Sequence, residues 1–445
     1  MSKYIFNRYT AIACFAIAIA GCKAPALSVQ EKKAMPESFA QSLDTANTAT
    51  VSWRTFFKDP NLAALIDEAL KNNQELLSTL QEIEIARSEV RARNGAILPS
   101  VGLRASAGVE KVGRYTSQGA GDASTEITPG HEMPDPLRDY TIGAYANWEV
   151  DIWKKLRNSK KAAVNRYLAS VEGKNFVMTS LVAEVADSYY ELLALDNQLE
   201  IVRQNIGLQQ NARDIVKLQK YAARSTELAV QKFEAETLSS QALEFDLLQK
   251  IRETENKINL LLGRYPQEIK RTPGFIDSAP MSVSTGIPSQ LLENRPDVKQ
   301  AELELMAAKL DVKAARAEFY PSLGISAGVG FEAFKTSYLF RTPESLLYSV
   351  ADDLVAPLIN RNAIRAEFNS ANARQLQALF NYEKTVLTAY LEVSNGLSAV
   401  DNLTKRYDLQ ARQVAALNKS SDAAGELFRS ARADYLEVLL TQRDA

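Results

Sequence analysis

Residues 86–109 read ARSEVRARNGAILPSVGLRASAGV, and residues 308–331 read AKLDVKAARAEFYPSLGISAGVGF. The two stretches follow one pattern: a helix-like run ends at Pro99 or Pro321, a serine follows, and apolar residues then alternate with small or polar ones. A repeat of this size indicates one supersecondary unit used twice. Because proline interrupts helices and alternation is typical of strands, each copy is predicted to pass from a helix into a strand.

Four alternating runs predict four strands, at about residues 100–111, 140–153, 322–332 and 346–359. Each run is about ten residues or longer and has one apolar and one polar face, which is typical of transmembrane β-strands. A soluble sheet packed on one face would give the same alternation, so the pattern alone leaves both structures open. Residues 112–139 are rich in Gly, Pro, Ser and Thr and are expected to form an exposed loop.

Aromatic and acidic residues add to this interpretation of the strands. Tyr140, Trp148 and Trp153 are placed to act as interfacial aromatics of a membrane-spanning sheet. Asp352 and Asp353 are interpreted as part of a polar strand face that lines a water-filled tube, rather than as a catalytic or metal site.

Long helices separate the strands. Asp59 is expected to cap a helix that starts at Pro60 and continues until Pro99 stops it. Residues 156–223 contain no proline, and at about 1.5 Å per residue they predict a helix of roughly 100 Å. Apolar residues step along it by alternating threes and fours, which indicates a coiled-coil seam. A second helix is expected to return over residues 227–262.

The N-terminus has the pattern of a secretory signal. Lys3 and Arg8 form a basic start, and residues 11–20 are apolar but too few to span a membrane. The run ends at Cys22 in the context of a bacterial lipobox, and Lys23 follows it, which favours sorting to the outer membrane. The alternative is an ordinary cleavage site with a chance cysteine.

Composition argues against several classes of function. The formal net charge is −2, which argues against nucleic acid as a partner. Cysteine occurs only at Cys14 and Cys22, and His131 is the single histidine. These residues leave no set of ligands for a zinc or copper site and no nucleophile paired with a base. The sequence therefore predicts no cofactor, no metal site and no enzymatic activity.

The number of strands predicts an assembly. Four strands cannot close a barrel, since small barrels need about eight, and an open sheet edge in lipid leaves backbone groups unsatisfied. Three chains would supply twelve strands. The predicted fold class is therefore a mixed α/β membrane protein in two structural repeats, with a four-stranded contribution to a trimeric 12-stranded transmembrane β-barrel and long antiparallel α-helical coiled-coil hairpins that form an α-barrel. A tube of this kind suits conduction.

The predicted organisation along the chain is a signal peptide over residues 1–21, a lipid anchor and linker over 22–60, a first repeat over 61–262, an equatorial linker over 263–295 and a second repeat over 296–445. The first helical hairpin turns near residues 224–226 and the second near 429–434. The helix after the second turn is much shorter than its counterpart in the first repeat, so the second repeat is expected to be truncated at its C-terminus.

Four stretches carry a family resemblance: WRTFFKDPNLAALIDEAL at 53–70, WEVDIWKKLR at 148–157, LLENRPDV at 291–298 and YLEVLLTQR at 435–443. In this order and spacing, together with the two Pro-Ser turns, the chain resembles the TolC-like outer-membrane efflux proteins, in their lipoprotein subset. The resemblance implies a homotrimeric channel-tunnel in the bacterial outer membrane, anchored by lipid at Cys22 and extending into the periplasm. It also implies a periplasmic membrane-fusion adaptor and an inner-membrane efflux transporter as partners, and drugs, metals or other small solutes as cargo.

The same resemblance assigns roles to residues at the two helical turns. Asp434 matches the acidic residues that narrow the periplasmic entrance in this family. The tips expected to contact the adaptor are at Arg224, Ser225, Thr226, Arg429 and Arg432.

The chain also departs from the family pattern at the tips. Ala223 and Ala431 stand where the family often has glycine, and Ala229 stands where an acidic residue is common. The alternative function is a non-conducting structural lipoprotein that spans the periplasm as a coiled-coil tether, which accounts for the lipid and the helices but not for the strands.

Overall fold

The computed structural model describes residues 51–272, 286, 288–357 and 361–430, together with the single positions 36, 39, 432, 433, 437, 438, 440 and 441. The chain divides into two compact units. Unit 1 comprises Met1–Lys32, Glu82–Ser170 and Gln300–Tyr382, and unit 2 comprises Lys33–Gln81, Val171–Lys299 and Glu383–Ala445.

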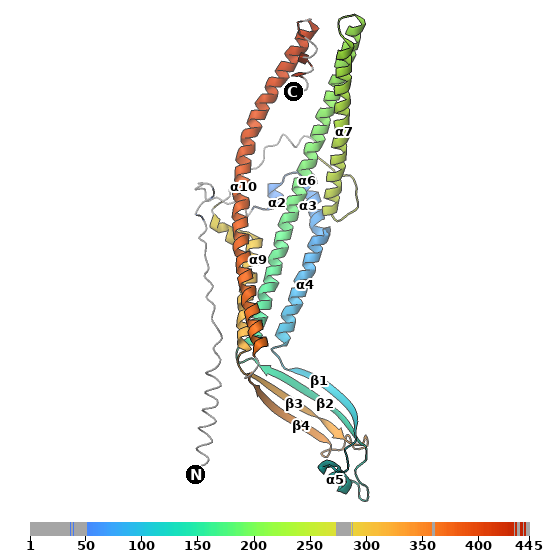
Figure 1. Cartoon of the computed structure of the whole chain (residues 1–445), viewed down its shortest axis with the longest axis vertical. Helices are drawn as coiled ribbons and strands as arrows, with labels where there is room; N and C mark the ends of the chain where they lie inside the picture. The colour runs from blue at the N-terminus through green and yellow to red at the C-terminus, as the bar shows by residue number, and fades with distance from the viewer. Residues whose placement is uncertain are drawn as a thin grey trace. The chain divides into compact units, whose positions relative to one another are not determined.

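Unit 1 contains one antiparallel sheet of four strands in the order β1-β2-β3-β4 (Figure 1). The strands are β1 (Ser100–Glu110), β2 (Leu137–Val150), β3 (Ser322–Ala333) and β4 (Leu346–Val355). Both hairpins come from equivalent positions of the two sequence repeats, and β2 pairs with β3 to join them. β2 begins and ends a few residues earlier than the alternation suggested, and β4 ends at Val355, with residues 358–360 outside the described part.

Helices supply the rest of the described chain. They are α2 (Trp53–Phe56), α3 (Pro60–Asn72), α4 (Gln74–Gly95), α5 (Ser117–Ser124), α6 (Lys155–Tyr221), α7 (Glu227–Leu261), the 3-10 turn η2 (Pro288–Gln290), α8 (Leu291–Asn294), α9 (Pro296–Ala317) and α10 (Asn362–Arg429). The 67 residues of α6 and the 68 of α10 are each continuous. Helix α5 interrupts the loop between β1 and β2, where the composition predicted no secondary structure. No described helix combines the length and apolarity needed to cross a membrane.

The single helix expected between Pro60 and Pro99 is wrong, because it is two helices with Asn73 between them. Asn73 adopts an extended backbone conformation, and its side-chain oxygen accepts the N–H of Leu76 at 2.9 Å. Its side-chain amide donates to the carbonyl of Leu261 at 3.0 Å, at the end of α7. The apolar period runs through the break, so the sequence pattern gave no sign of it.

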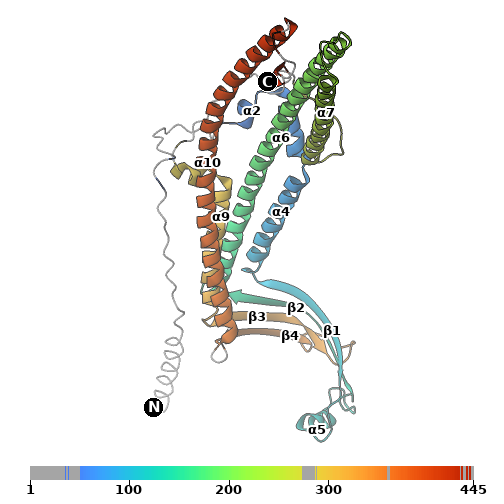
Figure 2. The ribbon, with the colours of Figure 1, turned by 45° about the horizontal axis from the view of Figure 1, so that its top comes forward.

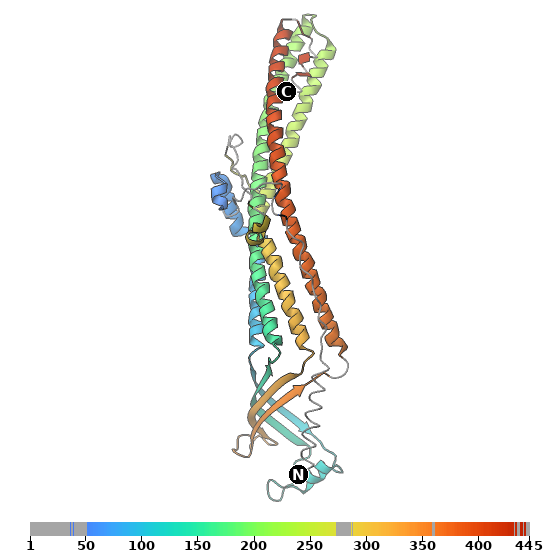
Figure 3. The ribbon, with the colours of Figure 1, turned by 90° about the vertical axis from the view of Figure 1, so that its left-hand side faces the viewer.

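The helices of unit 1 meet one end of the sheet, as Figure 3 shows for α4, α6 and α9. Lys160 of α6 donates to Asn94 of α4 at 2.8 Å. Phe319, just beyond α9, meets Phe368 of α10 edge to face, with ring centroids 5.7 Å apart. A small cluster of buried residues around this pair holds the two helices of the second repeat together.

Unit 2 is built around a core shared by α3, α6 and α7, with Tyr189 and Leu192 fully buried at its centre. The Tyr189 hydroxyl donates to Oδ2 of Asp59 at 2.8 Å and accepts the N–H of Thr272 at 3.2 Å. The Thr272 hydroxyl donates to Oδ1 of Asp59 at 3.0 Å. Burial and the hydrogen bond to Asp59 raise the pKa of Tyr189 to about 12. We call Asp59, Tyr189 and Thr272 the buried clamp.

Asp59 has a second role at the start of α3. Its Oδ1 accepts the N–H groups of Asn61 and Leu62 at 2.8 and 3.4 Å, and Pro60 occupies the first helical position. This is the cap that the sequence predicted. Close to the clamp, Arg271 contacts the carboxylates of Asp196 at 2.7 Å and Glu255 at 2.8 Å.

Candidate functional site

The sheet has two chemically different faces, which the strand register defines. The polar face carries Arg104, Ser106, Glu110, Thr141, Tyr145, Asn147, Glu149, Ser326, Glu332, Ser349 and Asp353, with six glycines among them. The apolar face carries Val101, Leu103, Val109, Ile142, Trp148, Ile325, Val329, Phe331, Tyr348, Val350 and Leu354. The same sheet can therefore meet lipid on one side and water on the other.

The apolar face and both edges of the sheet lack cover in a single chain. The exposed fraction of Leu103 is 90% and that of Val350 is 80%. The strands β1 and β4 are the sheet's edges (Figure 2). Every residue of β1 is exposed. Unpaired edges of this length invite pairing with another chain.

Asp352 and Asp353 fall on opposite faces. Asp353 is the register partner of Gly324 on β3, and Gly324 is in turn the partner of Glu149 on β2. Asp353 therefore shares the polar face with Glu149, as the sequence suggested. Asp352 pairs with Ile325 beside Trp148 and therefore lies on the apolar face, which corrects the interpretation of both carboxylates as one polar lining. Asp352 lies close to the end of β4, and a carboxylate on the lipid face is tolerated near the membrane surface far better than at its centre.

A hollow of about 730 Å³ lies in unit 1 where α4 approaches the sheet. Its polar lining includes Asn147, Glu149, Ser326 and Asp353, all from the polar face, and Ser100 at the start of β1. Apolar side chains that include Leu98, Ile325 and Val355 complete the lining, and Glu149 pairs with Lys155 at 2.5 Å. The hollow therefore has a mixed polar and apolar lining.

Two tryptophan side chains lie at the end of the sheet that borders this hollow. The Trp148 N–H donates to the carbonyl of Ile97 at 2.9 Å, and the Trp153 N–H donates to the carbonyl of Pro321 at 2.7 Å. Trp153 also stacks on Tyr320, with centroids 4.8 Å apart. Partly exposed aromatics with one polar contact are typical of the boundary between lipid and water.

The turn from β2 into α6 explains the WEVDIWKKLR stretch. Asp151 accepts the backbone N–H groups of Leu156 at 3.0 Å and Arg157 at 2.9 Å, and it pairs with the Arg157 side chain. Burial alone would raise the pKa of Asp151, but these hydrogen bonds outweigh it and hold that pKa below its usual value. Lys154 lies in the turn between β2 and α6 and has a backbone φ of 62°, a left-handed conformation that non-glycine residues rarely adopt.

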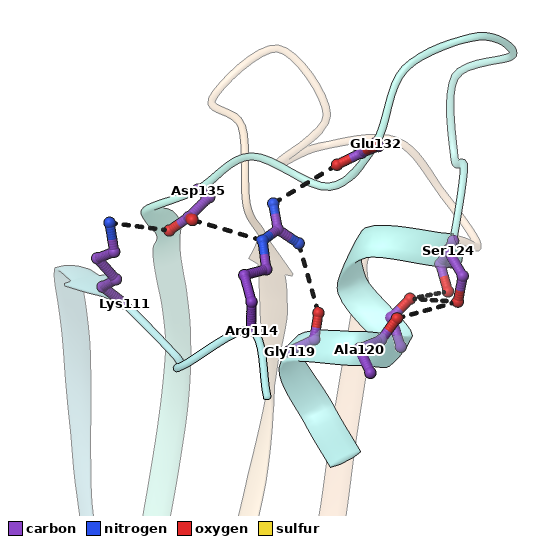
Figure 4. Close-up of polar contacts among 9 residues, drawn as sticks. Lys111, Arg114, Gly119, Ala120, Ser124, Glu132 and Asp135 are labelled. Atoms are coloured by element: carbon purple, nitrogen blue, oxygen red, sulfur yellow. Dashed lines mark hydrogen bonds and ion pairs between the residues drawn. The ribbon is translucent and has the colours of Figure 1, made fainter. Parts of the chain in front are cut away.

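The opposite end of the sheet is ordered by a cluster that the sequence did not predict (Figure 4). Arg114 lies 3.5 Å from Asp135 and 3.6 Å from Glu132, and it donates to the carbonyl of Gly119 in α5. Beyond the cluster, Thr128 hydrogen-bonds Tyr338 at 3.1 Å and so joins the loops of the two hairpins. Arg114 is an unremarkable residue of a polar loop, so its role depends on contacts that only the folded loop brings together.

The first predicted tip is the turn between α6 and α7. Arg224 and Thr226 are exposed, Ser225 is half-buried, and the Thr226 hydroxyl caps α7 by accepting the N–H of Ala229 at 3.2 Å. Ala223 has a φ of 52°, which gives a physical reason for a preference for glycine at this position. Ala229 is fully buried against α6, so a carboxylate there would lose its hydration.

The second predicted tip is only partly described. Phe428, near the end of α10, packs against a cluster of Val216, Val230 and Phe233 close to the first turn, so the end of α10 lies beside that turn within unit 2. Arg432 is exposed, and its N–H donates to the carbonyl of Leu427 at 2.8 Å.

Three of the predicted site residues lie wholly or partly outside the described part of the chain. Arg429 is the last residue of α10, and its side chain lies outside the described part. Asp434 and Cys22 lie outside the described residues altogether.

A family model named "Outer membrane efflux protein" matches residues 65–264 and 287–445. The chain belongs to this family. The match spans all four strands and the long helices α6, α7 and α10, and the efflux protein family is a family of channels rather than of enzymes.

Similar proteins agree with this assignment. The "Probable outer membrane lipoprotein SilC" of Salmonella typhimurium is 30% identical over 438 residues, covering 96% of this chain and 90% of that protein. The "Cation efflux system protein CusC" of Escherichia coli (strain K12) is 27% identical and covers 97% of this chain and 92% of that protein.

Solved structures have the same fold. A membrane protein from Pseudomonas aeruginosa superposes with a TM-score of 0.84 at 27% identity, covering 94% of this chain and 93% of that one. A crystal structure of CusC superposes with a TM-score of 0.80 at 26% identity, covering 94% and 92%. This outer membrane efflux protein therefore has the predicted mixed α/β channel fold, and its location is the outer membrane with helices that extend into the periplasm.

Proposed function

We propose that three copies of this efflux protein close a twelve-stranded barrel and serve as the exit duct of a tripartite efflux system. The observation that carries the proposal is a four-stranded sheet with one apolar face, one polar face and two unpaired edges. Pairing β4 of one copy with β1 of the next satisfies both edges and places the polar face around the lumen. The relatives are named for cations, pyoverdine and toluene, which supports a permissive lumen for small solutes.

The partners follow from the same proposal. The exposed side chains of Arg224, Thr226 and Arg432 are available to a periplasmic membrane-fusion adaptor, which in turn joins an inner-membrane efflux transporter. Ser225 and Arg429 complete the proposed adaptor-contacting tips. Their position beside the helical turns supports contact with another protein, since exposed turns on rigid helices commonly carry binding residues.

We propose that Asp434 lines the periplasmic entrance. A ring of three carboxylates in a narrow pore favours cations, so Asp434→Asn should change both the conductance and the cation preference. The measurement is single-channel recording of the purified trimer in a planar bilayer, with Asp422→Asn, which changes an exposed carboxylate of α10, as the matched control.

The outcomes of this recording separate two errors. If Asp434→Asn and Asp422→Asn both match the unmodified protein, Asp434 does not line the entrance. If the unmodified trimer forms no channel at all, the conducting function is wrong and the coiled-coil tether is the better account.

We also propose that Cys22 becomes the lipid-bearing N-terminus after removal of residues 1–21. Acyl chains add to the membrane attachment that the barrel already provides, so Cys22→Ala should leave a fraction of the protein bound to the membrane. The intact mass of the mature protein is expected to exceed that of the chain beginning at Cys22 by its acyl groups. An unmodified mass, or a mass that begins elsewhere, contradicts this proposal.

A further inference from the structure

Exposed basic side chains gather where the helices of unit 1 approach the sheet. They are Arg91 of α4, Lys154 at the turn into α6, Lys161 of α6, Lys313 and Arg316 of α9, and Arg365 of α10. Each lies within about two helical turns of the helix end nearest the sheet. We call these six residues the basic collar.

The described residues show no acidic partner for the collar, in contrast to several other cations of the same region. Neighbouring basic residues are paired: Arg93 with Glu89 at 2.7 Å, Lys155 with Glu149 at 2.5 Å, Arg157 with Asp151 at 2.9 Å, Arg374 with Glu367 at 3.4 Å, and Arg166 with Asp311. For the six collar residues, the described part of the chain holds no ion pair. The exposed carboxylates of this region for which the described residues show no ion pair are Glu318, Asp352 and Asp353, so six collar cations still outnumber them.

The collar residues lie on the exposed faces of their helices in the single chain. On α6, Ala162 and Ala163 beside Lys161 are buried, and on α9, Ala314 and Ala315 separate Lys313 from Arg316 and are also buried. Small buried residues allow the helices to pack closely, while the long cationic side chains remain in solvent. The charges are therefore available to a partner outside the single chain.

The position of the collar identifies that partner. The apolar face of the sheet continues past Trp148 to Val150, the last residue of β2. Trp153, stacked on Tyr320, lies just beyond it at the junction with the helices, where interfacial aromatics are expected. Lys154 directly follows this aromatic pair. Where an apolar belt and aromatic residues are succeeded by unpaired Lys and Arg, the surface is complementary to lipid headgroups that carry phosphate.

We propose that the basic collar binds anionic lipid headgroups of the leaflet from which the helices emerge. Each exposed Lys or Arg near an anionic membrane surface raises binding roughly fivefold, and several acting together enrich anionic lipid around the protein. This binding depends on the protein's place in the outer membrane and not on conduction. Its failure would leave the proposed duct intact.

Tryptophan fluorescence provides the test, because Trp148 and Trp153 lie at the level of the collar. The full-length trimer, with Trp53→Phe to remove the remaining tryptophan, is reconstituted into phosphatidylcholine vesicles that contain brominated phosphatidylglycerol or brominated phosphatidylcholine. Bromine quenches only nearby indoles. At low ionic strength we expect phosphatidylglycerol to quench several-fold more than its mole fraction predicts.

The collar variant replaces Lys154, Lys161, Lys313 and Arg316 with glutamine, and we expect it to lose the preference for phosphatidylglycerol. The matched control replaces four exposed cations of unit 2, Lys232, Lys250, Arg406 and Lys419, with glutamine and should retain the preference. Channel conductance of both variants should remain that of the unmodified trimer.

Three results would overturn the proposal. They are equal quenching by both lipids in the unmodified trimer, a preference that survives in the collar variant, and a preference lost equally in the control. If the collar variant does not assemble, the unmodified trimer still decides the matter. Its preference for phosphatidylglycerol must disappear as salt is added, because the screening length falls to about 3 Å at 1 M salt. An acidic protein surface as the real partner would appear as equal quenching by both lipids.

Discussion

Gly330→Ala will sharply reduce the amount of assembled trimer in the outer membrane. A Cβ atom at Gly330 would lie 2.4 Å from the carbonyl oxygen of Ile142 and 2.6 Å from Cα of Gly143, its register partner on β2. Both contacts are with backbone, so relief requires the two strands to move apart and lose ladder hydrogen bonds. Crowding of this kind costs about 1–3 kcal/mol in a packed interior, and three equivalent sites in a trimer multiply the effect.

Gly324→Ala is the matched control, because it lies on the same strand and the same face. A Cβ atom there meets only the carbonyl oxygen of Asp353 at 3.9 Å, an ordinary contact. The measurement is the yield of heat-resistant trimer in outer-membrane fractions on gels run without boiling. Equal yields from Gly330→Ala and Gly324→Ala would show that the β2–β3 pairing is looser than the structure describes.

Asp59→Ala should strongly destabilise unit 2. The carboxylate is 1% exposed and accepts the two N–H groups at the start of α3 as well as the hydroxyls of Tyr189 and Thr272. Loss of the cap costs about 1 kcal/mol, and leaving the buried Tyr189 hydroxyl without its acceptor costs about 1–3 kcal/mol more. We expect the midpoint of thermal unfolding, followed by helical circular dichroism in detergent, to fall by roughly 5–10 °C.

Two further variants locate the origin of that loss. Tyr189→Phe removes one hydroxyl and keeps the helix cap, so it should account for only part of the effect. Asp246→Ala removes an exposed carboxylate of α7 and should change the stability by less than about 0.5 kcal/mol. If Asp59→Ala is no worse than Asp246→Ala, the buried clamp does not hold unit 2 together.

The two faces of each strand and the start of α3 follow from side-chain period and local capping alone, without any tertiary contact. Strict alternation around Leu103 and Ile325 places residues on two faces of a strand, because side chains in a strand point alternately to opposite sides. Asp59 and Pro60 start α3 because the cap satisfies N–H groups only two and three residues away. Such features depend on neighbours in sequence, so they can be predicted from it.

The remaining features depended on residues far apart in the chain. Asn73 breaks a continuous apolar period because its amide reaches Leu261, 188 residues away. Asp352 and Asp353 are adjacent in sequence, and only pairing with β3 assigns one to each face. Gly330 needs to be glycine because β2 approaches it closely. The collar is left without described ion pairs because nearby acids such as Glu89 and Glu149 pair with other cations, Arg93 and Lys155. Charge pairing, register and close approach are properties of three-dimensional proximity, which periodicity along the chain does not encode.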